Sequence, residues 1–517
     1  MNLYRALLVF ATAVLIVACG EPLEPKPIVG ESASAPAFIG APASPQPIDV
    51  AIPPHPFMAQ QGLNAMHADG YSSDVHPGGG PLGNNVQMRS RVGITGAPGG
   101  QCATLTFDAQ HRLVALCAAM TGFRLHLIEP RSLRLLAEYK LPIRPSTYDA
   151  LIHRDKSYIM EDSSSAYFYL DDKDRVVMAA SDQTIRRISH QQDSSGNWSF
   201  ALQDSWDLSS YVPHDCTTPI NWNPDGECDP ITAVMPDHAG LIWWVTRRGR
   251  LGTLNPETGQ VLATQLDKEE IQNGFSVAQD GVYIVSDHAM YRFYADQSGA
   301  PKSGWREAYD RGTSRKVGTI NQGSGTTPTL IGENYVTVTD NADGRINLVV
   351  YHRQQDHQGP RQVCAVPLFE SGHSVTDNSM VAFNRSILIE NNAGYTSAYQ
   401  QEDWEHTAGG IMRIDIREDD SGCDVVWHSP EASPSVVPKF SAGNGLAYFY
   451  TFEKQADGQV AWYFTALDYA TGATQFKVLT GIGRAFDNNW APLTLGPDGT
   501  AYVGTAKGLV ALWDEGT

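Results

Sequence analysis

Short runs of alternating apolar and polar residues dominate the chain from about residue 88 onward. Each unit of roughly 40 to 60 residues holds several such runs, separated by turns rich in Asp, Asn and Gly. The most regular run of each unit recurs about eight times, at residues 113–117, 176–179, 241–245, 282–285, 335–339, 386–389, 447–450 and 501–504. Alternation of this kind predicts β-strands that bury one or both faces.

Sheets of about four strands repeated at this interval need neighbours to cover their faces, and radial repetition supplies them. We therefore predict an all-β fold, a single β-propeller of about eight four-stranded blades over residues 99–517. Seven blades is the alternative count, and a two-domain sandwich is the weaker alternative fold. The last unit, residues 488–514, holds only about three strands. Residues 87–95 alternate in the same way and are predicted to supply the missing strand and close the ring.

One stretch, residues 464–476, reads F-T-A-L-D-Y-A-T-G-A-T-Q-F, and a partial copy stands at residues 254–262. Its Thr-Gly pair is predicted to close the turn between the two outer strands of a blade, and its last aromatic residue to pack between blades. The stretch resembles the tryptophan-docking repeat of quinoprotein alcohol dehydrogenase-like propellers, with Phe476 in place of the usual Trp.

That resemblance implies a fold more than a reaction. The family includes pyrroloquinoline quinone (PQQ) enzymes and also cofactor-free members, such as the lipoprotein propeller of the outer-membrane barrel-assembly machine. The enzymes typically carry an adjacent Cys-Cys pair against the quinone, and some carry Cys-x-x-Cys-His for haem. Neither motif occurs in this chain. A PQQ-dependent dehydrogenase is therefore retained only as a second alternative.

The N-terminus indicates export. Arg5 is followed by an apolar run over residues 7–17, and Ile16-Val17-Ala18 precedes Cys19. This resembles a bacterial lipobox, which implies that residues 1–18 are a signal peptide and that Cys19 carries the lipid. The apolar run is shorter than the roughly 20 residues that span a bilayer. Gly20 stands where lipoproteins retained at the inner membrane often carry Asp, so the resemblance favours an anchor in the outer membrane, facing the periplasm.

Two further segments separate Cys19 from the propeller. Residues 19–57 are rich in Pro and Ala and are predicted to be a semi-extended tether. Residues 58–98 are predicted to hold a polar strap and the closing strand. Within the strap, His67, Asp69, Tyr71, Asp74 and His76 lie within ten residues of one another. Metal ligation is one interpretation of this cluster, and a polar strap across the body is the favoured one.

The charge and the cysteine content limit the classes of partner and the compartment that we expect. The 517 residues include 37 Lys and Arg against 57 Asp and Glu, a formal charge of −20, which disfavours nucleic acid. Six cysteines remain after Cys19, an even number that suits an oxidising compartment. We propose disulfides Cys102–Cys117, Cys216–Cys228 and Cys364–Cys423, one of 15 connectivities. Zinc binding is the alternative, without Cys-x-x-Cys spacing to support it.

Candidate functional residues follow from the topology. In a propeller, the loops after the second strands and the starts of the first strands open on one face around the channel. This places one ligand-binding set there: Arg247, Asn273, Asp287, Asp377, Asn378, Asn488 and Asn489. Asp340, Asn341, Glu390 and Asn391 form the best candidate metal site, with calcium as the fitting ion. Turn chemistry is the competing and favoured explanation for these Asp and Asn residues.

His288 and His373 are the candidate catalytic bases near such a site. Residues 394–410 are predicted to form a lid or binding loop over the same face. Two functions remain open: a membrane-anchored propeller lipoprotein that binds a ligand or an envelope protein, and a divalent-cation-dependent hydrolase or lyase. The absence of a complete catalytic motif favours the binding function.

Overall fold

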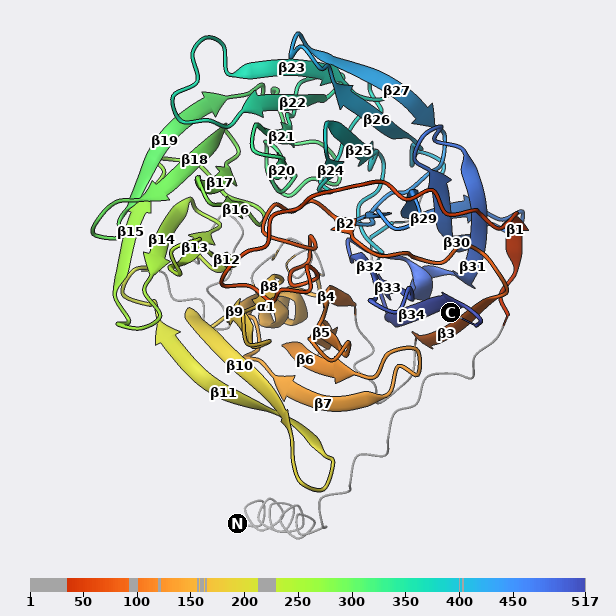
Figure 1. The fold of residues 1–517 in the computed structure, drawn as a ribbon, viewed down its shortest axis with the longest axis horizontal. Helices are drawn as coiled ribbons and strands as arrows, with labels where there is room; N and C mark the ends of the chain where they lie inside the picture. Colours follow the sequence, from red (N-terminus) through yellow and green to blue (C-terminus); the bar gives the residue numbers. More distant parts are fainter. Residues whose placement is uncertain are drawn as a thin grey trace, which may run out of the picture.

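Eight four-stranded blades form a ring around a central channel, and β1 and β2 extend the sheet of one of them to six strands (Figure 1). The computed structural model describes residues 35–92, 101–119, 122–155, 158, 162, 165–212, 229–398, 400–401 and 404–516. The predicted propeller is confirmed, with eight blades rather than seven, and the sandwich alternative is wrong. Aromatic and aliphatic side chains pack between adjacent blades, with the largest cluster around blade 7.

Blades are numbered along the chain, and the strands of each are given from the channel outward. Blade 1 comprises β4 (Cys102–Phe107), β5 (Leu113–Ala119), β6 (Gly122–Ile128) and β7 (Leu135–Lys140). Blade 2 comprises β8 (Phe168–Leu170), β9 (Val176–Ala179), β10 (Thr184–Gln192) and β11 (Trp198–Asp207). Blade 3 comprises β12 (Ile231–Pro236), β13 (Ile242–Thr246), β14 (Arg250–Leu254) and β15 (Val261–Gln265). Blade 4 comprises β16 (Ser276–Ala278), β17 (Gly281–Val285), β18 (Ala289–Ala295) and β19 (Pro301–Ala308).

The second half of the ring has the same order. Blade 5 comprises β20 (Thr329–Ile331), β21 (Tyr335–Thr339), β22 (Asn347–His352) and β23 (Gln362–Pro367). Blade 6 comprises β24 (Val381–Phe383), β25 (Ser386–Glu390), β26 (Ile411–Ile416) and β27 (Cys423–Ser429). Blade 7 comprises β28 (Lys439–Ser441), β29 (Leu446–Lys454), β30 (Val460–Asp468) and β31 (Thr474–Ile482). Blade 8 comprises β32 (Leu493–Leu495), β33 (Ala501–Thr505), β34 (Gly508–Asp514) and, from the N-terminal side, β3 (Val86–Val92).

The ring closes through β3, which pairs antiparallel with β34 from Val86 opposite Asp514 to Val92 opposite Gly508. This confirms the closing strand expected from the alternation of residues 87–95, of which residues 93–95 lie outside the described part. The C-terminal strand therefore has hydrogen-bonding partners on both sides, and β3 becomes the outer strand of blade 8.

The repeated turn is built as its letters predict. Asp468 Oδ1 accepts hydrogen bonds from the backbone N–H and hydroxyl of Thr471, and Gly472 follows with φ of 73° between β30 and β31. The neighbouring blade contributes the aromatic residue that packs against this turn. Trp427, on β27, donates its indole N–H to the carbonyl of Tyr469 at 2.8 Å. A tryptophan of one blade thus docks on the turn of the next.

The segment before the strap lies on the outside of blade 7. β1 (Phe38–Gly40) pairs with β31, and Phe38 stacks on Phe476 with ring centroids 5.5 Å apart. These residues fall in the predicted tether, so part of that segment is fixed to the propeller. From β1 the chain, drawn in red in Figure 1, runs from the rim into the middle of the ring.

The strap, residues 58–78, follows the inside of the channel. Its backbone carbonyls accept hydrogen bonds from the inner strands of blades 1, 2, 4, 5, 6 and 7, through the N–H groups of Phe107, Leu170, Val277, Leu330, Ala382 and Phe440. β2 (Val75–His76) also pairs in parallel with β28. The predicted polar strap is therefore a peptide that occupies the channel and joins most of the blades.

Two of the three proposed disulfides are present in the described residues, Cys102–Cys117 and Cys364–Cys423. Cys216 and Cys228 lie outside them, as does Cys19. The described part has one α-helix, α1 (Pro145–His153), and one short 3-10 helix, η1 (Arg484–Phe486). Within the described residues, helices are all too short or too polar to cross a bilayer.

Candidate functional site

A cavity of about 500 Å³ lies where the inner strands begin, and we call it the mouth pocket. Its wall includes the residues that lead into the inner strands, among them Ala166, Asn273, Ser379 and Trp490. Met66 and His67 of the strap form part of the same lining. The strap therefore forms part of the wall of the pocket, which we call its floor.

Three long connections, two between blades and one within a blade, contribute to the pocket. Residues 141–167, which include α1, link blades 1 and 2; residues 309–328 link blades 4 and 5; residues 391–410 link two strands within blade 6. Each of them contributes lining residues, including Arg144, Ile320 and Thr396. Connections of this length in a compact domain often carry function.

The connection 309–328 is fixed to the pocket wall by Asp377. The N–H of Ile320 and the side-chain amide of Gln272 donate to Asp377 Oδ2 at 3.3 and 3.0 Å. Gln272 Oε1 in turn accepts the N–H of Asn321 at 3.2 Å. These bonds join three segments of the chain at this point of the pocket wall.

Burial raises the pKa of the Asp377 carboxyl to about 7. The residue as a whole is partly exposed, but its Oδ1 atom is enclosed and has no hydrogen-bond partner. Oδ1 faces Gly325, where a Cβ atom would come within 1.8 Å of it. Desolvation without full hydrogen bonding disfavours the charged form. Near neutral pH the carboxyl is therefore divided between its protonated and ionised forms.

Both signs of charge are present in the lining. Arg144 lies over the ring of Phe123, with 4.4 Å from its guanidinium carbon to the centroid, and donates to the carbonyl of Asp162. Arg315 and Lys316 lie on the connection 309–328, and burial lowers the pKa of Lys316. The lining holds three basic residues, Arg144, Arg315 and Lys316, and two acidic ones, Asp162 and Asp377. Its balance of charge is therefore more positive than that of the whole chain, which has 37 basic and 57 acidic residues.

The amides of the pocket are paired with protein groups. Asn273 donates to the carbonyl of Gly325 and accepts the hydroxyl of Tyr167 at 3.3 Å. Asn489 bonds to Gln101, 388 residues earlier in the sequence. These bonds hold the side chains in place before a ligand arrives, which lowers the entropy cost of binding.

The structure brings four of the seven predicted ligand-binding residues to this pocket: Asn273, Asp377, Asn378 and Asn489. The other three lie elsewhere. Asn488 is buried and donates to the carbonyl of Gly504 at 2.8 Å. Arg247 is buried in the turn after β13, outside the pocket lining. Asp287 is held in a separate network.

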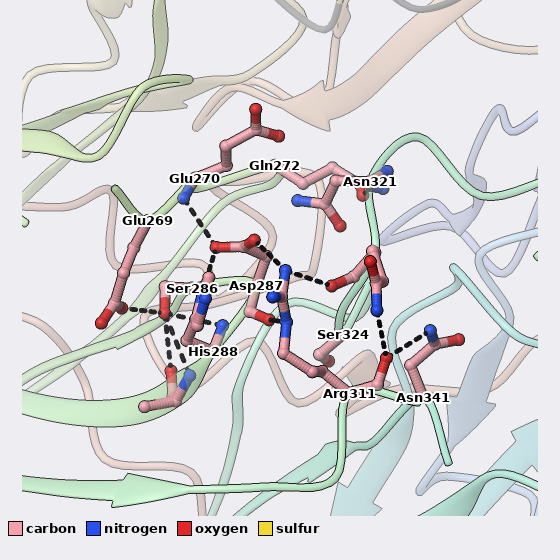
Figure 2. A network of polar contacts seen from close by, with 12 residues as sticks. Glu269, Glu270, Gln272, Ser286, Asp287, His288, Arg311, Asn321, Ser324 and Asn341 are labelled. Carbon is pink, nitrogen blue, oxygen red and sulfur yellow. Dashed lines mark hydrogen bonds and ion pairs between the residues drawn. The ribbon is translucent and has the colours of Figure 1, made fainter. Parts of the chain in front are cut away.

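Figure 2 shows that network, in which Asp287 is the central acceptor. Its Oδ1 accepts the N–H of Glu270 at 2.7 Å and the Nδ1 of His288 at 2.8 Å, and its Oδ2 pairs with Arg311 at 2.7 Å. The carbonyl of Arg311 accepts the side-chain amide of Asn341. The network joins blades 4 and 5 beside the pocket. His288 is oriented by a carboxylate and partly exposed, whereas His373 is an exposed turn residue.

The four candidate metal ligands are each engaged locally. Asp340 accepts from the N–H groups of Ala342 and Asn347, and Asn391 donates to the carbonyls of His373 and Gly409. Glu390 accepts the side-chain amide of Asn378, and burial raises its pKa well above the usual value. Among the described residues, His, Cys, Asp and Glu side chains do not gather in groups of three or more that could hold a metal. The calcium site stays a prediction.

The predicted lid, residues 394–410, is anchored rather than free. Tyr395 is fully buried and donates its hydroxyl to Asp487 at 2.7 Å, and Trp404 packs on Phe452 and Trp462. Thr396 and Gln400 of this segment do line the mouth pocket. Tyr399 lies outside the described residues.

Several lining residues were not expected from the sequence, above all Arg144, Tyr167, Gln272 and Arg315. The length of the connections 141–167 and 309–328 was the available signal. It marks a segment of interest but does not indicate which of its side chains face the channel.

The chain was compared with protein families, curated proteins and solved structures. No family model matches the chain. A curated relative, an uncharacterized protein of Archaeoglobus fulgidus, is 25% identical over 318 residues, which cover 55% of this chain and 61% of the relative. The match thus spans about three fifths of that relative's length.

Similar solved structures include BamB from Moraxella catarrhalis, 12% identical with a TM-score of 0.43, covering 83% of this chain and 98% of that one. Streptogramin B lyase is 9% identical with a TM-score of 0.37, covering 83% and 97%. The computationally designed Ika8 protein is 14% identical with a TM-score of 0.41, covering 80% and 96%. At these values the comparisons do not distinguish among functions.

Proposed function

We propose that this protein is an exported, membrane-tethered propeller that binds a small ligand in the mouth pocket. The observation that carries the proposal is the pocket itself. Its volume of about 500 Å³ falls in the range of small-molecule sites, and the strap forms its floor. The propeller supplies a rigid frame, and the three long connections supply the contacts.

The lining suits a ligand with both apolar faces and hydrogen-bonding groups. Trp490, Tyr167 and Phe123 offer aromatic surface, and amides and charged groups alternate with them. The overall charge of −20 disfavours polyanions such as nucleic acid. A small polar molecule with an aliphatic or aromatic part is the expected class.

The proposed location of the protein, exported and attached to a membrane, is inferred from the N-terminal sequence. The lipobox-like residues before Cys19 support lipid attachment, and the disulfides support an oxidising compartment. Metabolic labelling with a palmitate analogue tests the anchor: incorporation should be lost in Cys19→Ser. Labelling that persists in this variant would show that the lipid is attached elsewhere or that the label is unspecific.

Ligand binding is tested on the full-length protein extracted from its membrane. Native mass spectrometry should reveal a co-purified small molecule, and the same molecule should raise the melting temperature when added back. Ala166→Trp places a bulky side chain in the pocket wall and should abolish both effects. Ala239→Trp is the matched control, because Ala239 is an exposed turn residue outside the pocket lining. Equal binding by both variants would place the ligand elsewhere.

A further inference from the structure

The strap carries a histidine that is held by a buried carboxylate at the floor of the mouth pocket. His67 Nδ1 lies 3.0 Å from Asp74 Oδ2, and the side chains are 7% and 0% exposed. The other oxygen of Asp74 is paired with Lys439, whose ammonium also donates to the carbonyl of Met66 at 3.3 Å. Because carboxylate oxygens accept hydrogen bonds, the contact with Asp74 Oδ2 assigns the proton of the imidazole to Nδ1 of His67. Its Nε2 is then left as a base.

His67 lies at a junction between two cavities. His67, Met66 and Tyr167 line both the mouth pocket and a smaller cavity of about 20 Å³. Ser72 and Thr327 also line the smaller cavity, and Thr327 Oγ1 lies 3.4 Å from His67 Nε2. A distance of 3.4 Å is long for a hydrogen bond to a hydroxyl. The cavity is large enough for one water molecule, with the imidazole and hydroxyl groups as its polar partners.

Tyr167 stands on the ligand side of the same junction. Its ring centroid is 6.3 Å from that of His67, and its hydroxyl reaches Asn273 Oδ1 only at the long distance of 3.3 Å. Burial raises the pKa of Tyr167 above its usual value, so the hydroxyl remains a neutral donor. A neutral donor at this point can stabilise negative charge that develops on a carbonyl oxygen.

We propose that His67 is a general base that hydrolyses an ester-type ligand bound in the mouth pocket. The inference rests on the proposed function and adds a reaction to it. Asp74 orients the imidazole and stabilises its protonated form, as a carboxylate does for a catalytic histidine in general. Tyr167 donates to the carbonyl oxygen of the ligand.

The reaction is balanced with water as the sole co-reactant. The water gives one proton to His67 Nε2, and its oxygen forms a bond to the acyl carbon while the carbonyl electrons move onto oxygen. When the intermediate collapses, the bond from the acyl carbon to the alcohol oxygen breaks. The departing alkoxide takes the proton from His67 Nε2. The products are a carboxylic acid and an alcohol, and the imidazole is restored.

A purely structural role predicts different results. In that case His67 only helps Lys439 and Asp74 to fix the strap, and its replacement would lower stability without a specific effect on chemistry. His190 provides a matched control. It is held by Asp108 at 2.9 Å and its side chain is 4% exposed, but it lies in blade 2 outside both cavities.

The test uses the full-length protein with para-nitrophenyl acetate and para-nitrophenyl butyrate, each followed by release of nitrophenolate. The wild type should turn over repeatedly and saturate, with a normal solvent deuterium isotope effect. His67→Gln should lower the rate by about 10²- to 10⁴-fold, and Asp74→Asn should lower it as well. His190→Gln should stay within a few fold of the wild type. Melting curves of each variant verify folding.

The outcomes separate the two proposals. Wild-type protein without turnover of either ester, or His67→Gln with wild-type rates, overturns the catalytic inference. Ligand binding by the thermal-shift test would stand in both cases. His67→Gln that still binds the co-purified molecule but no longer hydrolyses the esters supports the inference. If Ala166→Trp loses both ligand binding and ester hydrolysis while His67→Gln hydrolyses the esters at the wild-type rate, a group other than His67 is the base.

Discussion

Lys439 and Asp74 form an ion pair that is shielded from solvent inside the channel, with side chains 1% and 0% exposed. Lys439 begins the inner strand of blade 7, and Asp74 belongs to the strap, 365 residues earlier. A buried charge without a partner is costly. The pair therefore adds to the backbone hydrogen bonds that hold the strap at the floor of the mouth pocket.

Lys439→Met should lower the free energy of unfolding by about 3–5 kcal/mol, because it leaves Asp74 buried and uncompensated. The double variant Lys439→Met, Asp74→Leu should recover most of that loss. Urea unfolding followed by tryptophan fluorescence measures both. Lys454→Met is the control, since its pair with Glu405 is exposed and should contribute no more than about 1 kcal/mol. A double variant as unstable as the single one would contradict this explanation.

Gly472→Ala should destabilise the protein more than Gly259→Ala. Both glycines have φ of 73° in equivalent turns, so both substitutions carry the left-handed strain of about 1–2 kcal/mol. A Cβ atom at Gly472 would lie 2.5 Å from the ring of Trp427, whereas one at Gly259 meets nothing within 4 Å. The contact should add about 1–3 kcal/mol to the loss. Equal losses in calorimetry would show that Trp427 does not dock tightly on this turn.

The two described disulfides should stabilise the fold unequally. Cys364–Cys423 joins the outer strands of blades 5 and 6 across 59 residues, whereas Cys102–Cys117 closes a hairpin of 15. In the chain-entropy account, the longer loop restricts the unfolded state more. Replacing both cysteines of the 364–423 pair with serine should cost about 1 kcal/mol more than replacing the 102–117 pair. Chemical denaturation of the two double variants measures the difference, and the reverse order would refute the entropic account.

Asp377 should make stability depend on pH. Its pKa is about 7 in the folded protein and near 3.9 in an unfolded chain. Between these values the native state holds more protons than the unfolded state. The free energy of unfolding should therefore fall as pH rises from about 4 to about 7, by up to about 1.4 kcal/mol per pH unit for this group.

Asp377→Asn removes that titration and should flatten the slope measured by urea unfolding at several pH values. Burial also raises the pKa values of Asp69 and Asp487 to about 7. These two carboxyls should therefore still contribute to the slope in the Asp377→Asn variant. Asp457→Asn, at an exposed turn, should leave the slope between about pH 5 and pH 7 unchanged, because a hydrogen bond from the backbone of Gln459 lowers the pKa of that carboxyl and confines its titration to more acidic solutions. A slope identical in Asp377→Asn and wild type would mean that the carboxyl is ionised in the fold near pH 5.

Alternation in the sequence was enough to predict the propeller, the closing strand β3 and the Thr-Gly turn before β31, because these features depend on neighbouring residues and on period-two burial. The location of Asn273, Asp377, Asn378 and Asn489 followed from the same topology. The roles of Asp340 and Asn391 could not be assigned from the sequence, because oxygen ligands and turn-forming side chains are the same residue types.

The sequence by itself determined the strands and their order, and it predicted that Asn273, Asp377, Asn378 and Asn489 lie on one face of the ring. Only the tertiary structure decided that the strap enters the channel, because the donors for its backbone carbonyls come from the inner strands of six different blades. It also decided which side chains line the pocket. Gln101 and Asn489 are 388 residues apart in the sequence and form a hydrogen bond because β3 closes the ring. The pattern of neighbouring residues does not predict a contact over such a separation.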